Sequence, residues 1–264
     1  MESRRHGILI GYDGSEDADA AVLWAARAAR LRQEPVVVVI AEDTGADTIG
    51  LRWWPESYWR ELGERAEGLL RKEGVTDVRV ERHTGSLVPV LVPLADDATM
   101  LVLGSRGHGR AGQTFVGSTS AGAAGHAPCP VVVVREPADP GSDRVVVGSD
   151  GSEGSAAALD FACRQAGLEG QRVLVLHGHG DGEGDDAAAG VAAAVDRARE
   201  GHPGVPLETE TVAGPPAQAL VDASAAAALV VVGSRGLRAY EGQQLGSVSH
   251  DVLRRATCSV AVVR

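Results

Sequence analysis

The sequence feature that most constrains the fold is an internal repeat of a short glycine-rich motif. Gly104-Ser-Arg-Gly107 is separated by nine residues from Gly117-Ser118, and Gly233-Ser-Arg-Gly236 is separated by the same interval from Gly246-Ser247. Each copy directly follows an apolar run that is typical of a buried strand. Glycine lets backbone N–H groups approach an anion closely, and a serine hydroxyl near a helix start adds a donor. Two copies at one spacing therefore indicate two phosphate-binding loops in two similar halves.

The repeat continues on both sides of the glycine motif. Each half begins with a short apolar strand that ends in Asp-Gly-Ser, at Asp13 in the first half and at Asp150 in the second. Alanine-rich helical segments and further apolar strands follow in the order βαβαβαβαβ. This alternation predicts an α/β fold, in which right-handed crossovers place helices on both faces of a parallel sheet. A linker from Pro137 to Asp143 separates two predicted domains, 1–136 and 143–264.

The composition argues against several classes of protein. Lys and Arg number 25 and Asp and Glu number 36, which gives a net charge of −11. This balance disfavours general binding to nucleic acid or to an anionic membrane. No apolar run approaches the ~20 residues that span a bilayer, and the cysteines have no metal-like spacing. They are expected to be buried thiols in a reducing cytosol, so a cytoplasmic location is expected.

In this organisation the sequence resembles the universal stress protein family in its tandem two-domain form. The family's nucleotide-binding signature is Gly-x2-Gly-x9-Gly followed by Ser or Thr, and both halves carry it intact. The first half also looks like the family at Pro128-Cys-Pro130, ahead of its last strand. The second half departs from the family there, since it reads Thr257-Cys-Ser259, and its loop carries Leu237-Arg238 where the first half has His108-Gly109.

The resemblance implies an open Rossmann-like sheet of strand order 3-2-1-4-5 in each half. It also implies that ATP or ADP, with magnesium as an optional companion, is held between the ends of strands one and four. Because the family pairs through its last strand, Val131–Val134 and Val260–Val263 are expected to join the halves as an internal pseudo-dimer. Pairing of whole chains as a homodimer and docking of an unidentified protein partner are further expectations.

The positions of the motifs agree with this placement on physical grounds. Ligands of open α/β sheets bind beyond the carboxyl ends of the strands, where the strand order reverses. Backbone amides at the glycines and the first serine hydroxyl are expected to hold phosphate and ribose oxygens. Asp13 would repel a bare phosphate and is assigned to the base or ribose side or to a metal, with Ala41, and His177 in the second half, walling the adenine pocket. The assigned residues are Asp13, Ala41, Gly104, Gly107, Gly117 and Ser118 in the first half and Asp150, His177, Gly233, Gly236, Gly246 and Ser247 in the second. The alternative is a tight turn at each glycine and a helix cap at Asp13, with no ligand.

Three classes of function fit these motifs. The leading hypothesis is a nucleotide-binding regulatory module, because no repeated His, Lys or Glu stands beside the loops as a catalytic base. Slow ATP hydrolysis or self-phosphorylation, with Ser118 and Ser247 near the phosphates, is the enzymatic alternative. A scaffold that binds no nucleotide is the third, against which the intact motifs count.

Other signals in the sequence are weaker. Gly107 to Gly112 matches a dinucleotide fingerprint but follows the wrong strand. His177 and His179 lack a third metal ligand, and the acidic run that begins at Asp181 lacks the glutamate of a calcium loop. An insert with Trp53, Trp54, Tyr58 and Trp59 is interpreted as a cover over its own domain, with partner docking as the alternative.

Overall fold

The computed structural model describes residues 6–42, 55–107, 116–179, 185–237 and 244–264. The chain forms two compact units, Met1–Val134 and Arg135–Arg264. The second unit begins where Arg135 donates its backbone N–H to the Ser259 hydroxyl, at 3.2 Å, and its guanidinium to the Leu253 carbonyl. The change between units therefore falls just ahead of the Pro/Gly-rich linker.

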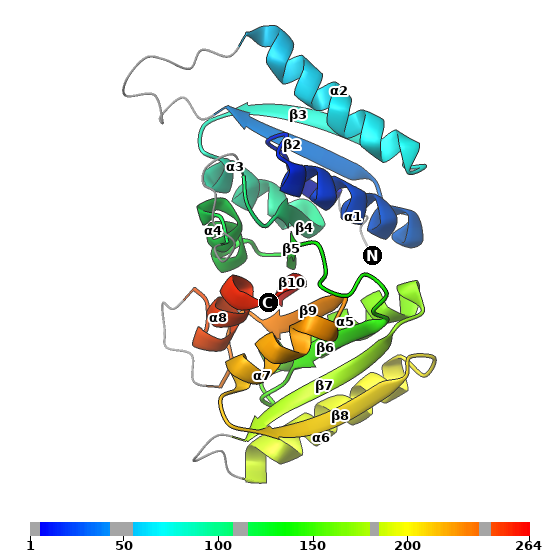
Figure 1. Cartoon of the computed structure of the whole chain (residues 1–264), viewed down its shortest axis with the longest axis vertical. Helices are drawn as coiled ribbons and strands as arrows, with labels where there is room; N and C mark the ends of the chain where they lie inside the picture. The colour runs from blue at the N-terminus through cyan, green and yellow to red at the C-terminus, as the bar shows by residue number, and fades with distance from the viewer. Residues whose placement is uncertain (1–5, 43–54, 108–115, 180–184, 238–243) are drawn as a thin grey trace. The chain divides into compact units, whose positions relative to one another are not determined.

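Unit 1 is a five-stranded parallel sheet of order β3-β2-β1-β4-β5 (Figure 1). Its elements in chain order are β1 (Gly7–Gly11), α1 (Glu16–Arg32), β2 (Val36–Glu42), α2 (Glu56–Lys72), β3 (Val78–Thr84), α3 (Leu87–Leu94), the 3-10 helix η1 (Ala95–Asp97), β4 (Ala98–Gly104), α4 (Ser118–His126) and β5 (Val131–Val134).

Unit 2 repeats this topology in a parallel sheet of order β8-β7-β6-β9-β10. Its elements are β6 (Arg144–Gly148), α5 (Glu153–Glu169), β7 (Arg172–His179), α6 (Asp185–Gly201), β8 (Leu207–Ala213), α7 (Pro216–Ala223), the 3-10 helix η2 (Ser224–Ala226), β9 (Leu229–Gly233), α8 (Ser247–Arg255) and β10 (Ser259–Val263). The predicted α/β class and strand order 3-2-1-4-5 are confirmed in both units.

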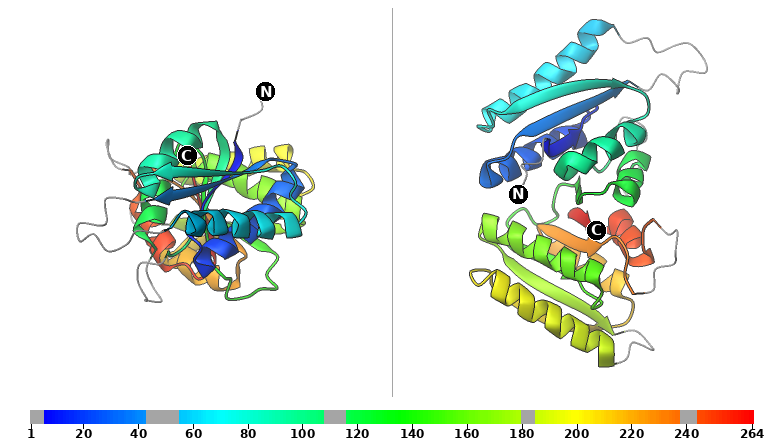
Figure 2. Two further views of the ribbon diagram at one scale, coloured as in Figure 1. Left: turned by 90° about the horizontal axis from the view of Figure 1, so that it is seen from above. Right: turned by 180° about the vertical axis from the view of Figure 1, so that it is seen from behind.

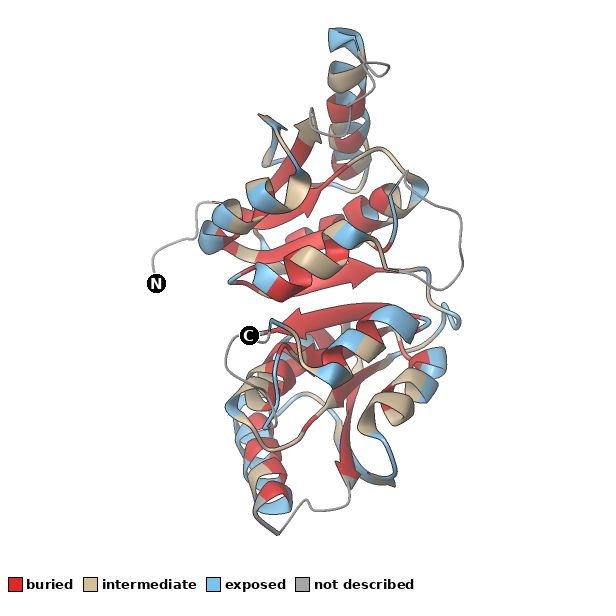
Figure 3. Cartoon of the chain, turned by 90° about the vertical axis from the view of Figure 1, so that its left-hand side faces the viewer, coloured by how far each residue is buried: buried red, intermediate tan, exposed pale blue. Residues whose placement is uncertain are grey.

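The core of each unit follows from the strand sequences. The inner strands are continuous Val, Ile and Leu runs that are buried on both faces, as parallel strands under two helical layers must be (Figure 3). The edge strands β3 and β8 are mostly exposed and carry charged residues instead. Sequence alone places the strands well, because these short apolar runs are bounded by turns.

The helices cover both faces of each sheet. In unit 1, α1 contacts α2 and α3 contacts α4, and in unit 2, α5 contacts α6 and α7 contacts α8 (Figure 2). Buried alanines on α1 and α5 let these helices approach the sheet closely. Among the described residues no helix is both long and apolar enough to cross a membrane.

The second strands are longer than the sequence indicated. The apolar run Val36–Ile40 predicts a strand that ends before Ala41, but β2 extends to Glu42 and so contains Ala41. β7 likewise extends to His179 and contains His177. Both extensions pair in register with the edge strand, Ala41 with His83 and His177 with Thr211. This backbone pairing continues the strands through residues that do not fit the apolar pattern.

Candidate functional site

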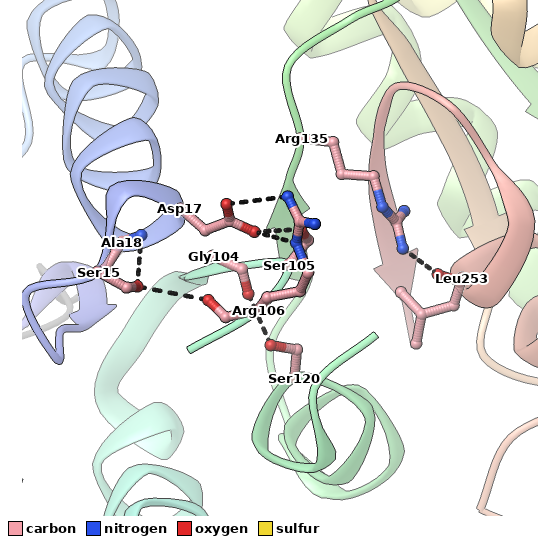
Figure 4. A network of polar contacts seen from close by, with 9 residues as sticks. All are labelled: Ser15, Asp17, Ala18, Gly104, Ser105, Arg106, Ser120, Arg135 and Leu253. Atoms are coloured by element: carbon pink, nitrogen blue, oxygen red, sulfur yellow. Dashed lines mark hydrogen bonds and ion pairs between the residues drawn. The ribbon is translucent and has the colours of Figure 1, made fainter. Parts of the chain in front are cut away.

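The candidate site of unit 1 lies where the carboxyl ends of β1 and β4 meet. These strands are direct neighbours, with Ile10 opposite Val102. The turn after β1 is built around Asp13, whose Oδ1 accepts the Ser15 N–H at 3.0 Å. Ser15 in turn caps α1, since its hydroxyl accepts the Ala18 N–H at 3.2 Å (Figure 4).

The loop after β4 packs directly on this turn. A Cβ on Gly107 would overlap Oδ2 of Asp13, and a Cβ on Gly104 would lie 2.7 Å from the backbone carbonyl of Asp17 in the first turn of α1. At Gly104 the obstacle is backbone, so close packing alone is sufficient to require glycine there. At Gly107 the obstacle is the end of the Asp13 side chain, which would have to move to admit a Cβ. This packing supports the tight-turn interpretation for Gly104 without excluding a ligand beside it.

A second set of bonds joins the loop to the start of α4. The Gly117 N–H donates to the Ser105 carbonyl at 2.8 Å. The Ser120 hydroxyl donates to the Gly104 carbonyl at 2.7 Å (Figure 4). The Gly117 amide was expected to contact phosphate, but in the structure it closes the loop. The donors that face outward by helix geometry are the N–H groups of Ser118, Thr119 and Ser120, because the first N–H groups of a helix have no intrahelical acceptor.

Asp17 ties the side chains of the loop to α1. Its Oδ2 accepts the Ser105 hydroxyl at 2.6 Å and the Arg106 Nε at 3.0 Å, and its Oδ1 accepts the Arg106 Nη2 at 3.3 Å (Figure 4). Burial by itself would raise the pKa of Asp17, but the hydrogen bonds from Arg106 and Ser105 outweigh it and hold the pKa below its ordinary value. Asp17 is therefore ionised at neutral pH.

Unit 2 builds the same turn and loop around Asp150. Asp150 accepts the Ser152 N–H at 3.1 Å and hydroxyl at 2.6 Å, and it accepts the Leu237 N–H at 2.8 Å. Burial tends to raise the pKa of Asp150, but these hydrogen bonds lower it overall. A Cβ on Gly236 would overlap this carboxylate, just as a Cβ on Gly107 would overlap that of Asp13. The carboxylate therefore clamps the loop to the turn, a role closer to the capping alternative than to a ribose contact.

The loop of unit 2 is closed by the same pair of bonds as in unit 1. The Gly246 N–H donates to the Ser234 carbonyl at 2.8 Å, and the Ser249 hydroxyl donates to the Gly233 carbonyl at 2.5 Å. A Cβ on Gly233 would lie 3.0 Å from the backbone of Gly154. Ser247 begins α8, as Ser118 begins α4.

His177 is not the counterpart of Ala41. Gly11 lies opposite Val39 and Gly148 opposite Leu176, so the register aligns His177 with Ile40 and Gly178 with Ala41. His177 is buried, with Nδ1 3.1 Å from the Ser149 carbonyl. A Cβ on Gly178 would lie 2.7 Å from Pro216, so the position that matches Ala41 is closely covered by α7.

Several residues at the sites were not singled out from the sequence. Ser120 and Ser249 carry a repeated signal, since each stands three residues after the last glycine of its motif. Asp17 carries no such signal, because the matching position in the second half is Gly154. The buried Tyr12 hydroxyl donates to Asp19 at 2.7 Å, a contact that only the packed structure reveals.

Some of the weaker sequence signals fall outside the described residues. These are Trp53, Trp54, His108, Gly109, Arg238 and the acidic run from Asp181. Trp59 is described, and its ring packs edge-on against Tyr58 and lies 5.3 Å from the Arg82 guanidinium of β3. This residue therefore contacts its own unit, as a cover would. Within the part of the chain that the structure describes, no group of three or more His, Cys, Asp or Glu side chains is arranged to hold a metal.

Comparison with known proteins identifies both halves. The model of the universal stress protein family matches residues 5–135 and again 141–264. Universal stress protein Rv2005c of Mycobacterium tuberculosis is 33% identical over 291 residues, which cover 99% of this chain and 98% of the relative. Universal stress protein Rv2623 of the same organism is 34% identical over 285 residues, covering 98% and 96%.

A solved structure gives the same fold. The crystal structure of a universal stress protein from Archaeoglobus fulgidus aligns with 100% of this chain and 99% of its own, with a TM-score of 0.76 and 22% sequence identity. The sequence relatives and the repeated family match together cover both units. The chain thus belongs to the universal stress protein family, in a form that carries two family domains in tandem.

Proposed function

We propose that this protein is a stress-response regulatory module that binds ATP or ADP at the carboxyl edge of its sheets. The nucleotide would lie between the ends of β1 and β4 in unit 1 and between the ends of β6 and β9 in unit 2. The proposed residues are Asp13, Ala41, Gly104, Gly107, Gly117 and Ser118 in unit 1 and Asp150, Gly233, Gly236, Gly246 and Ser247 in unit 2. A change in occupancy would be communicated to a protein partner.

The observation that carries the proposal is the same built loop in two units. In each unit, one backbone hydrogen bond of 2.8 Å and one hydrogen bond from a serine hydroxyl fasten the glycine loop to the N-terminus of the following helix. The outward N–H groups and hydroxyls of that helix start are thereby fixed beside the Asp-Gly-Ser turn. A preformed set of donors at a strand-order reversal is the arrangement that holds phosphate in open α/β sheets.

The residues fit a phosphate group in chemistry as well as in position. Ser118 and Thr119 supply hydroxyls at the positive end of α4, and Ser247 supplies one at α8. Asp13 stands on the far side of the glycine loop, against Gly107, where its charge is held by the Ser15 N–H. Magnesium, if it accompanies the nucleotide, would supply charge neutralisation of the phosphates.

The test is calorimetric titration of ATP and ADP into the full chain and into a Gly117→Ala, Gly246→Ala double variant. The structure makes this variant benign to the fold, because a Cβ at Gly117 would lie 3.5 Å from the Ser105 carbonyl and one at Gly246 3.6 Å from Ser234. Gly117 also has an extended backbone with φ −61°, which alanine adopts freely. The added methyls stand where an anion oxygen would approach, so we expect binding to weaken about tenfold or more.

A matched control is Gly68→Ala, on the outside of α2, where a new Cβ meets no atom within 4 Å. This variant should bind as the unmodified protein does. The proposal fails if neither nucleotide produces a binding heat, or if the double variant binds as tightly as the control.

A further inference from the structure

The two loops differ in the residue that faces their Ser-Arg pair from the preceding helix. In unit 1 this residue is Asp17, in the first turn of α1. The corresponding residue in α5 is Gly154, since Asp13 aligns with Asp150 and the intervening turn has the same length. Backbone packing confirms the equivalence, because Gly104 abuts Asp17 as Gly233 abuts Gly154. One carboxylate is therefore present beside the first loop and absent from the same place beside the second.

In unit 1 this carboxylate holds both side chains of the Ser-Arg pair. The Ser105 hydroxyl and the Arg106 guanidinium both donate hydrogen bonds to the Asp17 carboxylate, at donor–acceptor distances between 2.6 and 3.3 Å (Figure 4). The Asp17 side chain is 22% exposed and the Arg106 side chain 46%, so the pair sits at the mouth of the loop. A phosphate that reached this loop would compete with Asp17 for the guanidinium and would also be repelled by its charge.

In the part of unit 2 that the structure describes, no carboxylate accepts a hydrogen bond from the equivalent donors, Ser234 and Arg235. Ser234 is buried and Arg235 is exposed. Among these residues, Arg106 of unit 1 is therefore offset by Asp17, whereas Arg235 of unit 2 has no carboxylate at the matching position, Gly154.

The remaining carboxylate at each site does not remove this difference. Asp13 and Asp150 occupy the same place against Gly107 and Gly236. Each unit therefore has one carboxylate at this position, and three donated hydrogen bonds stabilise that of Asp150 in its charged form. Asp17, which bonds to the Ser-Arg pair of unit 1, is thus a carboxylate with no counterpart at the matching position of unit 2, Gly154.

Resting on the proposed nucleotide binding, we propose that Asp17 is a specificity-determining residue that makes the two sites select ligands of different charge. The loop of unit 2 takes nucleoside di- or triphosphates. The loop of unit 1 binds the same polyphosphates more weakly, because Asp17 holds Arg106 and adds its own negative charge. The two sites of one chain would then differ in how strongly they prefer ADP or ATP to a nucleoside or its monophosphate.

The test isolates unit 1 in the full chain by closing unit 2. Ser247→Asp places a carboxylate at the first residue of α8, where the helix tolerates negative charge and a phosphate would otherwise bind. In this background, adenosine, AMP and ADP are titrated calorimetrically with Asp17 intact and with Asp17→Asn. The substitution keeps the size of the side chain and removes its charge, and Asp17→Gly, which supplies the residue of unit 2, is the second variant.

We expect Asp17→Asn to raise the affinity of unit 1 for ADP about threefold to tenfold and to leave adenosine unchanged, since only the phosphates meet the removed charge. The change in affinity for AMP should lie between the changes for adenosine and ADP. Asp96→Asn is the matched control, because this exposed residue of η1 lies before β4, at the opposite end of the strand from the loop. It changes net charge equally and should alter none of the affinities.

The converse pair is Gly154→Asp and Gly154→Asn in a Ser118→Asp background, which leaves unit 2 open. Both variants add a Cβ that would lie 2.8 Å from the Arg235 carbonyl, so they share any steric cost. We expect Gly154→Asp to weaken ADP binding more than Gly154→Asn does. The affinity for adenosine should be the same in the two variants.

The outcomes separate this inference from the proposed function. If the unmodified chain binds ADP and neither Asp17 variant changes its preference among the three ligands, the inference is wrong and nucleotide binding stands. An equal gain for adenosine and ADP would overturn it too, because it would show a change of shape instead of charge. If no ligand binds the unmodified chain or any variant, both proposals fail.

Discussion

At the scale of the residue, the aspartate after the first strand shows how one carboxylate can hold a loop without a ligand. Asp150 accepts three hydrogen bonds from Ser152 and Leu237, which join the turn after β6 to the loop after β9. Hydrogen bonds to the charged form favour ionisation, so its pKa lies below the ordinary value of about 3.9 although burial acts in the opposite direction. This position therefore makes the stability of the fold depend on pH.

Asp150→Asn should lower the free energy of unfolding at pH 7 by roughly 1–3 kcal/mol, the range for hydrogen bonds to a buried charged group. Because the folded pKa is depressed, the stabilisation by the carboxylate is fully present above the unfolded pKa and is lost as pH falls toward the folded pKa. The difference between the protein and the variant should consequently shrink between about pH 5 and pH 2. Urea unfolding followed by far-UV circular dichroism across this range measures it.

The control for this prediction is Asp196→Asn on α6. Its ion pair with Arg199 spans 3.5 Å between side chains that are 72% and 55% exposed, so it contributes little. A difference between Asp150→Asn and the unmodified protein that stays constant from pH 7 to pH 2 would contradict the assigned role of the carboxylate.

Residue identities in the site were predictable only where the repeat displayed them. The spacing of Gly104, Gly107 and Gly117 was visible in both halves, but the reason for each glycine was not. The structure assigns Gly104 to close packing against the backbone of Asp17, a property of helix placement that no linear pattern encodes. His177 was mismatched with Ala41 because strand length, and therefore register, depends on pairing with the neighbouring strand.

At the scale of the element, the first helix of each unit ends in the same conformation with different residues. The C-terminal cap of α1 is Gln33, with φ 55° and ψ 45°, and the cap of α5 is Gly170, with φ 68° and ψ 28°. Both caps donate their N–H to a carbonyl of the last helical turn, that of Ala29 or Ala166. Left-handed backbone strains any residue with a Cβ, so glycine is the better cap.

Gln33→Gly should raise the free energy of unfolding of unit 1 by about 0.5–1 kcal/mol. Gly170→Ala should lower that of unit 2 by a similar amount, and the effect is conformational because a Cβ at Gly170 meets no atom within 4 Å. Thermal or urea unfolding of the two variants checks both signs. Gly201→Ala at the end of α6, where a Cβ also meets nothing within 4 Å, is the control without a left-handed backbone. Two changes of the same sign at Gln33 and Gly170 would refute the strain argument.

The elements themselves were largely predictable from the sequence. Short runs such as Val36–Ile40 have one physical solution, a strand covered on both faces, and the alternation with alanine-rich segments leaves a parallel sheet as the fold. The apolar runs Val36–Ile40 and Val173–Leu176 end two and three residues before β2 and β7 do, because backbone pairing with β3 and β8 continues past them.

At the scale of the whole molecule, each unit taken by itself ends its sheet on an apolar strand, β5 or β10. β5 pairs with β4 within unit 1, and β10 pairs with β9 within unit 2. An edge strand with an apolar sequence, such as Val131–Val134, needs a cover in solution. The family resemblance predicts that the two edges cover each other, so the unfolding of one unit should expose the edge of the other.

The tryptophans allow this to be tested in the intact chain. All four lie before residue 60, so tryptophan fluorescence reports the unfolding of unit 1 alone, whereas far-UV circular dichroism reports both units. Gly170→Ala weakens unit 2 and changes nothing near a tryptophan. If the units cover each other, this variant should shift the fluorescence transition to lower urea together with the dichroism transition. If each unit is stable alone, the fluorescence transition stays in place while only part of the dichroism change moves.

The second result would also leave Val131–Val134 without a cover inside the chain. The predicted partner would then be a second molecule instead of the other unit, and analytical ultracentrifugation would detect a dimer.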